Sequence, residues 1–198
     1  MLAVGTMDGV FLVEPEAPTR STTLSKLAVY TVRSAGEHLI AGTADGVYRS
    51  SDRGHSWRRV GLEGCEVLAV EVSPWNVDIL LASTRPPALC RSTDRGASWS
   101  PVKSLNAAPG AETWSVPHVP GGAPSGFRRG ARAHTIAFDP FDPDRFWIGV
   151  EVGALAGTDD SGGSWWSVVP GNNPDVHAVV PDPARKGRLY LSAGFGRL

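Results

Sequence analysis

The chain has 198 residues, 19 of them basic and 20 acidic, which gives a formal net charge of −1. This balance offers no electrostatic basis for binding nucleic acid or an anionic membrane, and a hydrophobic share of 41% is too high for a disordered chain. The longest apolar runs cover about five residues, too few for a transmembrane helix. Residues 1–5 read as a strand without a basic or long apolar leader, so we expect no secretory signal and a cytoplasmic location.

The predicted elements are short strands joined by tight turns, and they repeat in groups of four. In chain order they form a partial unit over 1–27, full units over 28–62 and 63–103, an insertion loop over 104–132, a full unit over 133–170 and a partial unit over 171–198. Four short strands in about 42 residues is the period of a β-propeller blade. The sequence therefore predicts an all-β fold.

An octapeptide of the pattern Ser/Thr-x-Asp-x-Gly-x-Ser-Trp follows the third strand of each full unit. Because it joins the last two strands of a blade, we expect a hairpin whose Asp accepts backbone N–H groups and whose Gly takes a positive φ. The Trp is expected to seal one blade against its neighbour. The repeated positions are Asp52, Gly54, Trp57, Asp94, Gly96, Trp99, Asp160, Gly162 and Trp165.

This octapeptide resembles the Asp-box, or BNR, repeat of the propellers of sialidases, sortilin-type receptors, xyloglucanases and photosystem II assembly-factor-like proteins. The resemblance covers most of the chain and implies a structural turn on the periphery of each blade, with any activity elsewhere. Three full blades and two partial ones are fewer than relatives of this type have. We therefore expect an open or incomplete propeller, which can self-associate through its exposed blade edges.

The two cysteines do not indicate a disulfide framework or a metal site. Cys65 and Cys90 are too few for the first and lack ligand spacing for the second, so we expect free thiols, no metal and no cofactor. The acidic segment 139–144 is interpreted as a turn, since calcium needs about six to eight oxygen ligands.

The candidate site lies at the rim opposite the octapeptides, where the first strand of each blade begins and the second ends. Blade alignment places polar and aromatic side chains there, with more from the insertion (His118 and Phe127 to Arg129). We expect Glu151 and Asp175 to be the catalytic pair if the protein is an enzyme, and the ligand-binding residues to be Arg85, Arg132, His134, His177 and Trp114.

Two functions remain open on the sequence alone. The first is a non-catalytic scaffold that binds a protein or a carbohydrate, and the second is a glycoside hydrolase-like protein, or a piece of one, that uses the two carboxylates. A third possibility is a fragment that has no activity of its own. The Phe/Tyr-Arg-Ile-Pro motif of sialidases has no counterpart here, so sialidase chemistry is not expected. The same residues are also compatible with a purely structural role, because clustered charged groups at a rim are often only solvated.

Overall fold

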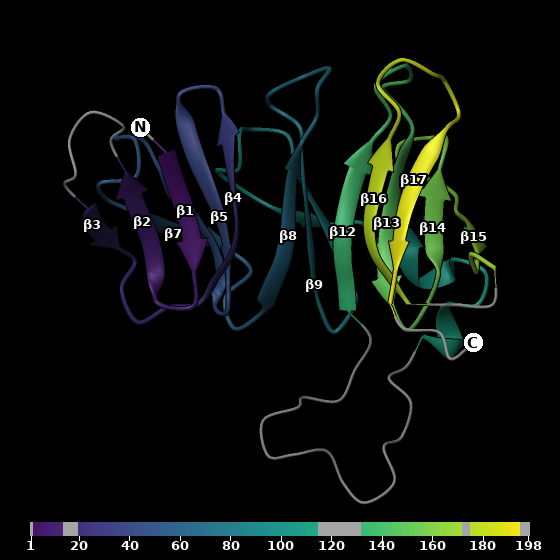
Figure 1. The fold of residues 1–198 in the computed structure, drawn as a ribbon, viewed down its shortest axis with the longest axis horizontal. Coiled ribbons are helices and arrows are strands. Elements are labelled where there is room, and N and C mark those ends of the chain that lie inside the picture. The colour runs from purple at the N-terminus through teal and green to yellow at the C-terminus, as the bar shows by residue number, and fades with distance from the viewer. Residues whose placement is uncertain (1, 14–19, 115–131, 172–174, 195–198) are drawn as a thin grey trace, which may run out of the picture. The chain divides into compact units, whose positions relative to one another are not determined.

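The computed structural model describes residues 2–13, 20–114, 132–171 and 175–194. Its regular structure is almost wholly antiparallel β-sheet, with two short 3₁₀ helices, η1 (Lys103–Ala107) and η2 (Ala111–Thr113) (Figure 1). Across these described ranges, none of the helices has the length and apolar character that crossing a bilayer requires.

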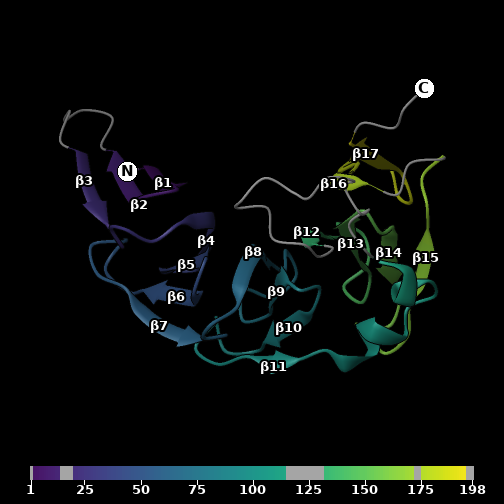
Figure 2. The same cartoon turned by 90° about the horizontal axis from the view of Figure 1, so that it is seen from below.

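The strands form five sheets, which we call blades 1 to 5 in chain order. Each blade is a meander in which successive strands pair antiparallel, and in Figure 2 the strands β4 to β7 follow one another across blade 2. The bounds are β1 Leu2–Thr6, β2 Gly9–Val13 and β3 Arg20–Thr23 in blade 1; β4 Val29–Ala35, β5 His38–Thr43, β6 Gly46–Ser50 and β7 Arg58–Gly61 in blade 2; β8 Glu66–Val72, β9 Leu80–Arg85, β10 Leu89–Ser92 and β11 Ser100–Pro101 in blade 3; β12 Arg132–Phe138, β13 Phe146–Glu151, β14 Leu155–Thr158 and β15 Trp166–Val168 in blade 4; and β16 Val176–Pro181 and β17 Leu189–Ala193 in blade 5.

The predicted fold class is confirmed. Blades 2, 3 and 4 have four strands each, whereas blade 1 has three and blade 5 has two in the part of the chain that the structure describes.

The tight turns have a shared chemistry. In the β5–β6 turn the hydroxyl of Thr43 donates to the carbonyl of Gly46 over 2.8 Å, and the N–H of Asp45 donates back to that hydroxyl. Thr6 and Gly9 repeat the first bond between β1 and β2.

The chain divides into two compact units, one of residues 1–84 and 89–101 and one of residues 85–88 and 102–198. In the first unit, apolar side chains fill the space between consecutive blades. Val10 and Leu12 of blade 1 pack with Val29 and Ala41 of blade 2. A second cluster joins blades 2 and 3, and its members include Ile40, Val47, Val67, Val70 and Leu80.

The second unit repeats this arrangement between blades 4 and 5. Ala137, Trp147 and Leu155 of blade 4 pack with Val176 and Val179 of blade 5. The second strand of blade 5, β17, is mostly exposed. In blade 4, by contrast, the second strand β13 is buried from Phe146 to Val150 and reaches partial exposure only at Glu151. The polar end of this strand therefore marks the rim where side chains become accessible.

Glycine at one repeated position allows the blades to approach closely. A methyl group on Gly42 would lie 2.8 Å from the carbonyl oxygen of Val67 in blade 3, and one on Gly149 would lie 2.8 Å from Cγ1 of Val176 in blade 5. Atoms do not approach this closely without displacement. The missing side chain is thus what lets the first strand of the next blade pack directly against the second strand.

Candidate functional site

Two histidines of the candidate site lie at β-bulges. The pairing of β12 with β13 shifts register between Ala133 and Thr135, so that His134 is the extra residue, and the pairing of β16 with β17 shifts in the same way at His177. A bulge leaves one residue unpaired and redirects its side chain. The same shift occurs at Tyr30 in β4, so the bulge recurs at one position of the blade. Of the three bulged residues in these described strand pairings, only those of blades 4 and 5 are histidines.

The structure brings five of the predicted site residues together in the second unit. His177 lies with Nε2 3.1 Å from Oδ1 of Asp175, and Nη1 of Arg132 donates to Oε2 of Glu151 over 3.2 Å. The rings of His134 and His177 lie with their centroids 5.6 Å apart. An arginine–carboxylate pair and a histidine–carboxylate pair therefore lie side by side at the ends of β12, β13 and β16.

The pocket beside these pairs is formed largely by blade 5. It has a volume of about 500 Å³ and is lined by Glu151, Asp175, His177, Ser192, Ala193 and Gly194. The last three residues were not predicted as site residues. Their position follows from strand pairing, because Val176 lies opposite Ala193 and Ala178 lies opposite Ser192. A register assignment for blade 5 would have found them.

Gly194 lines the pocket next to Asp175 and His177, where a side chain would not fit. A methyl group at this position would lie 2.0 Å from Oδ2 of Asp175 and 2.8 Å from Nε2 of His177. The backbone N–H of Gly194 donates to the carbonyl of Asp175 over 2.7 Å, which fixes the end of β17 against the start of β16. The contact between Asp175 and His177 thus depends on glycine here.

The electrostatic environment favours a neutral imidazole at His134. Desolvation by the surrounding residues lowers the pKa of His134 below 6.5 although part of the residue is exposed, and the charges of His177 and Arg132 act in the same direction. The carboxylates of Glu151 and Asp175 oppose this pKa shift without reversing it. At neutral pH His134 is therefore a hydrogen-bonding group rather than a cation.

The remaining predicted ligand residues are placed differently. Arg85 ends β9 and is absent from the lining of this pocket in the described ranges, and the same holds for Trp114, which follows η2. The indole of Trp114 lies beside the β13–β14 turn, since a methyl group on Gly153 would be 3.2 Å from its Cδ1. His118 and Phe127 to Arg129 lie outside the described residues.

The site also presents atoms that can hold a divalent cation. One carboxylate oxygen each from Glu151 and Asp175, together with a ring nitrogen of His177, all lie within 4.8 Å of one another. Such a mixed set of oxygen and nitrogen donors suits a first-row divalent metal better than calcium. Each carboxylate already has a partner within the chain, Arg132 for Glu151 and His177 for Asp175.

The three octapeptides form nearly identical hydrogen-bonded turns. In the first copy, the carboxylate of Asp52 accepts from the backbone N–H of Ser56 over 2.8 Å and from its hydroxyl over 2.6 Å, and Ser50 donates to it over 2.8 Å. The second and third copies repeat these bonds around Asp94 and Asp160. Gly54, Gly96 and Gly162 have φ values of 89°, 76° and 91°, as the sequence predicts.

These bonds fully engage the aspartate carboxylates. Hydrogen bonds from the Ser56 hydroxyl and N–H and from Ser50 lower the pKa of Asp52 to about 2, and bonds from Ser164 and Thr158 do the same for the pKa of Asp160. For Asp94, desolvation is the largest single influence and raises the pKa, but bonds from Ser98 and Ser92 outweigh it and bring the pKa to about 2. A carboxylate held in this way serves the turn and not catalysis.

The tryptophans of the octapeptides contact the segment that precedes them in the same unit. Nε1 of Trp57 donates to the hydroxyl of Thr23 in blade 1 over 3.0 Å, and the ring of Trp99 lies against Gly61 of blade 2. In the second unit, Nε1 of Trp165 donates to the hydroxyl of Ser104 over 3.1 Å. All three indoles are partly buried. Trp57 and Trp99 contact the preceding blade, as predicted, whereas Trp165 contacts η1 of the insertion.

Comparison with known proteins gave matches only among solved structures: no protein-family profile and no curated protein matched the chain. An ancestral GH74 enzyme is 20% identical over 82% of this chain, with a TM-score of 0.61. The extracellular domain of BT4673 from B. thetaiotaomicron is 10% identical over 98%, with a TM-score of 0.70. YCF48 bound to D1 peptide is 12% identical over 87%, with a TM-score of 0.57.

The chain spans only part of the length of each of these proteins: 21% of the GH74 enzyme, 25% of the BT4673 domain and 51% of YCF48. At such low identity the likeness concerns the fold and leaves activity open. The aligned structures are of β-propeller types. The chain therefore has the fold of an incomplete β-propeller, with three complete blades and two partial ones among its described residues.

Proposed function

We propose that this chain is a non-catalytic propeller scaffold that binds a protein or carbohydrate ligand at the rim of blades 4 and 5. The observation that carries the proposal is the pocket of about 500 Å³ at which Glu151, Asp175 and His177 converge. Small-ligand and side-chain sites are typically concave and have a few convergent polar groups. YCF48 has been captured with a peptide, which shows that a related fold is suited to such binding.

The ion pairs favour binding over catalysis. A general acid must release a proton to a leaving group, and a nucleophile must reach the reacting carbon. Here Glu151 is ion-paired with Arg132, and Asp175 contacts His177, so each carboxylate would first have to leave its partner. Paired side chains of fixed geometry are instead well suited to exchange hydrogen bonds with hydroxyl, amide or ammonium groups of a ligand.

The proposal is tested by probing immobilised glycans and a peptide library with the wild-type chain and with a Glu151→Gln/Asp175→Asn double variant. We expect at least one ligand class to bind the wild type and to lose about tenfold or more in affinity with the double variant. Glu71→Gln is the matched control, because it removes the exposed Arg33–Glu71 ion pair of blades 2 and 3 and lies in the other unit. Equal binding by wild type and double variant would refute the assignment of the ligand to this pocket.

A second candidate function is glycoside hydrolysis with retention of configuration. The nearest donor oxygens of Glu151 and Asp175 lie within 4.8 Å, which is close to the separation of about 5–5.5 Å in retaining enzymes and well below the roughly 6.5–9.5 Å of inverting ones. If hydrolysis of aryl glycosides is detected, both Glu151→Gln and Asp175→Asn should abolish it. Unchanged hydrolysis in both variants would exclude this pair.

Self-association through a blade edge is a further part of the proposal. In the described residues the pairing of β17 is with β16 alone, which makes its other edge the candidate for strand addition, and Tyr190 on this strand is 54% exposed. Such an edge is a template for another strand. Sedimentation velocity at increasing protein concentration should show a larger species, and replacing Leu191 with Lys should suppress it.

A further inference from the structure

Blade 2 contains a second pocket, which belongs to the first unit and is unrelated to the site on blades 4 and 5. It lies beside the first octapeptide and has a volume of about 380 Å³. Its lining is rich in basic and hydroxyl groups: His38, Arg49, Ser51, Ser56, Trp57 and Arg58. Three of these six side chains are basic and none is acidic. The carboxylate of Asp52 lies next to the lining, where it accepts a hydrogen bond from the hydroxyl of Ser56 over 2.6 Å.

The positive charges of this pocket lack partners within the described chain. Arg49 on β6 lies opposite Arg58 on β7 in the strand register, and no carboxylate oxygen in the described ranges comes within 4.0 Å of either guanidinium. The buried Nε atom of Arg49 and the buried Nδ1 atom of His38 have no hydrogen-bond partner there. The exposed carboxylate of Glu37 lies 3.7 Å from Nε2 of His38. Like charges placed side by side without compensation are unfavourable.

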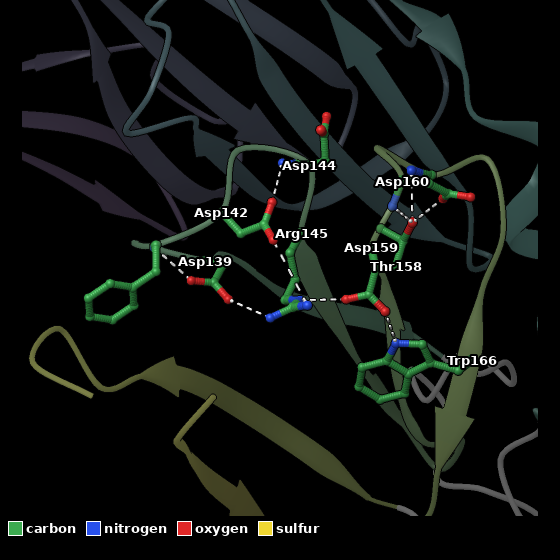
Figure 3. Close-up of polar contacts among 10 residues, drawn as sticks. Asp139, Asp142, Asp144, Arg145, Thr158, Asp159, Asp160 and Trp166 are labelled. Atoms are coloured by element: carbon green, nitrogen blue, oxygen red, sulfur yellow. Dashed lines mark hydrogen bonds and ion pairs between the residues drawn. The ribbon is translucent and has the colours of Figure 1, made fainter. Parts of the chain in front are cut away.

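The equivalent place in blade 4 contains its own anion. The first residue of each octapeptide pairs with the second strand, Ser50 with Leu39 and Thr158 with Phe146, and this register makes Ser51 equivalent to Asp159. Asp159 accepts a hydrogen bond from Nε of Arg145, which stands at the position of His38. It also accepts one from Nε1 of Trp166 over 3.1 Å, and Trp166 stands at the position of Arg58 (Figure 3).

The indole of Trp166 also fills the space that is open in blade 2. Gly157 is the equivalent of Arg49, and a methyl group on it would lie 2.2 Å from the Trp166 ring. Blade 4 therefore has a carboxylate and an aromatic ring where blade 2 has a serine and a cavity bordered by two arginines. The space at this position of the blade is therefore filled by side chains in blade 4 and open in blade 2.

We propose that the blade 2 pocket binds the carboxylate of an aspartate or glutamate side chain from a partner polypeptide, in the place that Asp159 takes in blade 4. Arg58 offers a guanidinium for charge-assisted hydrogen bonds, and the hydroxyl of Ser51 adds a small donor. Nε1 of Trp57 is already bonded to Thr23 and to the carbonyl of Gly54, so its ring borders the pocket as an apolar wall for the methylene groups of the ligand.

The test is an NMR titration at pH 7 of the ¹⁵N-labelled full chain with an N-acetylated, C-amidated Gly-Asp-Gly tripeptide. The signals to follow are the indole N–H of Trp57 and the ring of His38. Saturable shifts are expected, with a Kd on the order of 1–10 mM for a single charge-assisted contact. The Gly-Asn-Gly peptide differs only in lacking the charge, and it should cause no saturable shift.

Two variants taken from the chain's own repeats sharpen the test. Arg58→Ser introduces the residue that blade 3 has at this position, Ser100, and should weaken peptide binding about tenfold or more. Ser51→Asp supplies the carboxylate of blade 4 and should abolish binding without lowering the thermal midpoint, so it remains informative if Arg58→Ser fails to fold. Arg33→Ser removes an exposed arginine of the same blade that is paired with Glu71, and it should bind like the wild type.

The proposal is overturned if the wild type shows no saturable shift, if the Asn peptide binds as well as the Asp peptide, or if folded Ser51→Asp retains binding. Parallel titrations with glucuronate and inorganic phosphate identify the anion. Tighter binding of either than of the Asp peptide would overturn the assignment to an acidic side chain.

Discussion

Nε2 of His177 lies 3.1 Å from Oδ1 of Asp175, and the two side chains meet only because residue 194 is a glycine. Asp175 precedes β16, His177 is the bulged residue of that strand, and Gly194 follows β17. Three backbone segments therefore determine one side-chain contact. A substitution at Gly194 therefore tests the pocket without removing the carboxylate of Asp175 or the imidazole of His177.

Gly194→Ala is expected to separate Asp175 from His177, because the new methyl group would lie 2.0 Å from Oδ2 of Asp175. The ring signals of His177 should shift in NMR spectra, and the ligand found by array screening should bind about tenfold or more weakly. Gly187→Ala is the control: its φ of 76° makes alanine unfavourable, but nothing lies within 4 Å of the added methyl group. Unchanged binding by Gly194→Ala would contradict the role of the pocket.

The protonation of His134 provides a pH-dependent prediction. Desolvation lowers the pKa of His134 below 6.5 in the folded chain, so the unfolded chain takes up the proton more readily. This difference in proton uptake does not affect stability above pH 6.5, and it destabilises the folded chain increasingly as the pH falls from 6.5 towards the folded-state pKa. NMR titration of the His134 ring should give a midpoint below 6.5, and His134→Gln should lose less stability than the wild type between pH 7 and 5. A midpoint at or above 6.5 would show that the environment does not favour the neutral ring.

Much of the fold is predictable from the sequence because the blade is a local unit. Its strands, its turns and the octapeptide all lie within about 42 residues, and the positive φ of Gly54 and its equivalents follows from residue type. The convergence of Glu151, Asp175 and His177 is also predictable, since repeat alignment alone puts equivalent strand ends at one rim. Arg85 was assigned by the same alignment and Trp114 as part of the insertion, but neither lines the pocket.

Features that depend on register and repacking are not predictable from the repeat. The bulges at His134 and His177 are irregularities of strand pairing without a residue signature, and Ser192 to Gly194 join the pocket only through the pairing of β16 with β17. Likewise, the presence of Ser51 where blade 4 has an aspartate becomes informative only when Asp159 is seen bonded to Arg145 and Trp166. These are contacts between side chains, which the order of strands does not specify.

The octapeptide carboxylate makes a prediction about acid stability. Asp94→Ala removes bonds to Ser92 and Ser98, and we expect a loss of about 1–2 kcal/mol in unfolding free energy at pH 7, limited by solvent exposure. Because the pKa of Asp94 falls from 3.8 to about 2 on folding, this difference should be complete above pH 3.8 and shrink as the pH falls towards 2. Urea denaturation at several pH values measures it. Glu112→Ala, an exposed change in η2, should have little effect, and a difference between Asp94→Ala and wild type that grows on acidification would contradict the argument.

Removal of divalent metals should leave the chain unchanged. Arg132 is ion-paired with Glu151, and His177 contacts Asp175, so the carboxylates of the three-donor group already have partners within the chain. We expect dialysis against EDTA to shift the thermal midpoint by less than about 1 °C, and added Zn²⁺ or Mn²⁺ at micromolar concentration to give no stabilisation. A rise in the midpoint that depends on Zn²⁺ and disappears in Asp175→Asn would instead show a metal site.

The close approach of blades 2 and 3 can be tested at Gly42. In Gly42→Ala the added methyl group would lie 2.7 Å from Cγ2 of Thr31 and 2.8 Å from the carbonyl oxygen of Val67, so the strands must move apart. We expect a loss of about 1–3 kcal/mol in unfolding free energy, measured by urea denaturation. Adding Thr31→Ser removes Cγ2 and should restore only part of this loss, because the backbone of Val67 cannot yield. Full restoration would show that blade 3 is not in direct contact with this strand, and no loss in Gly42→Ala would show that the blades are packed more loosely than the structure has them.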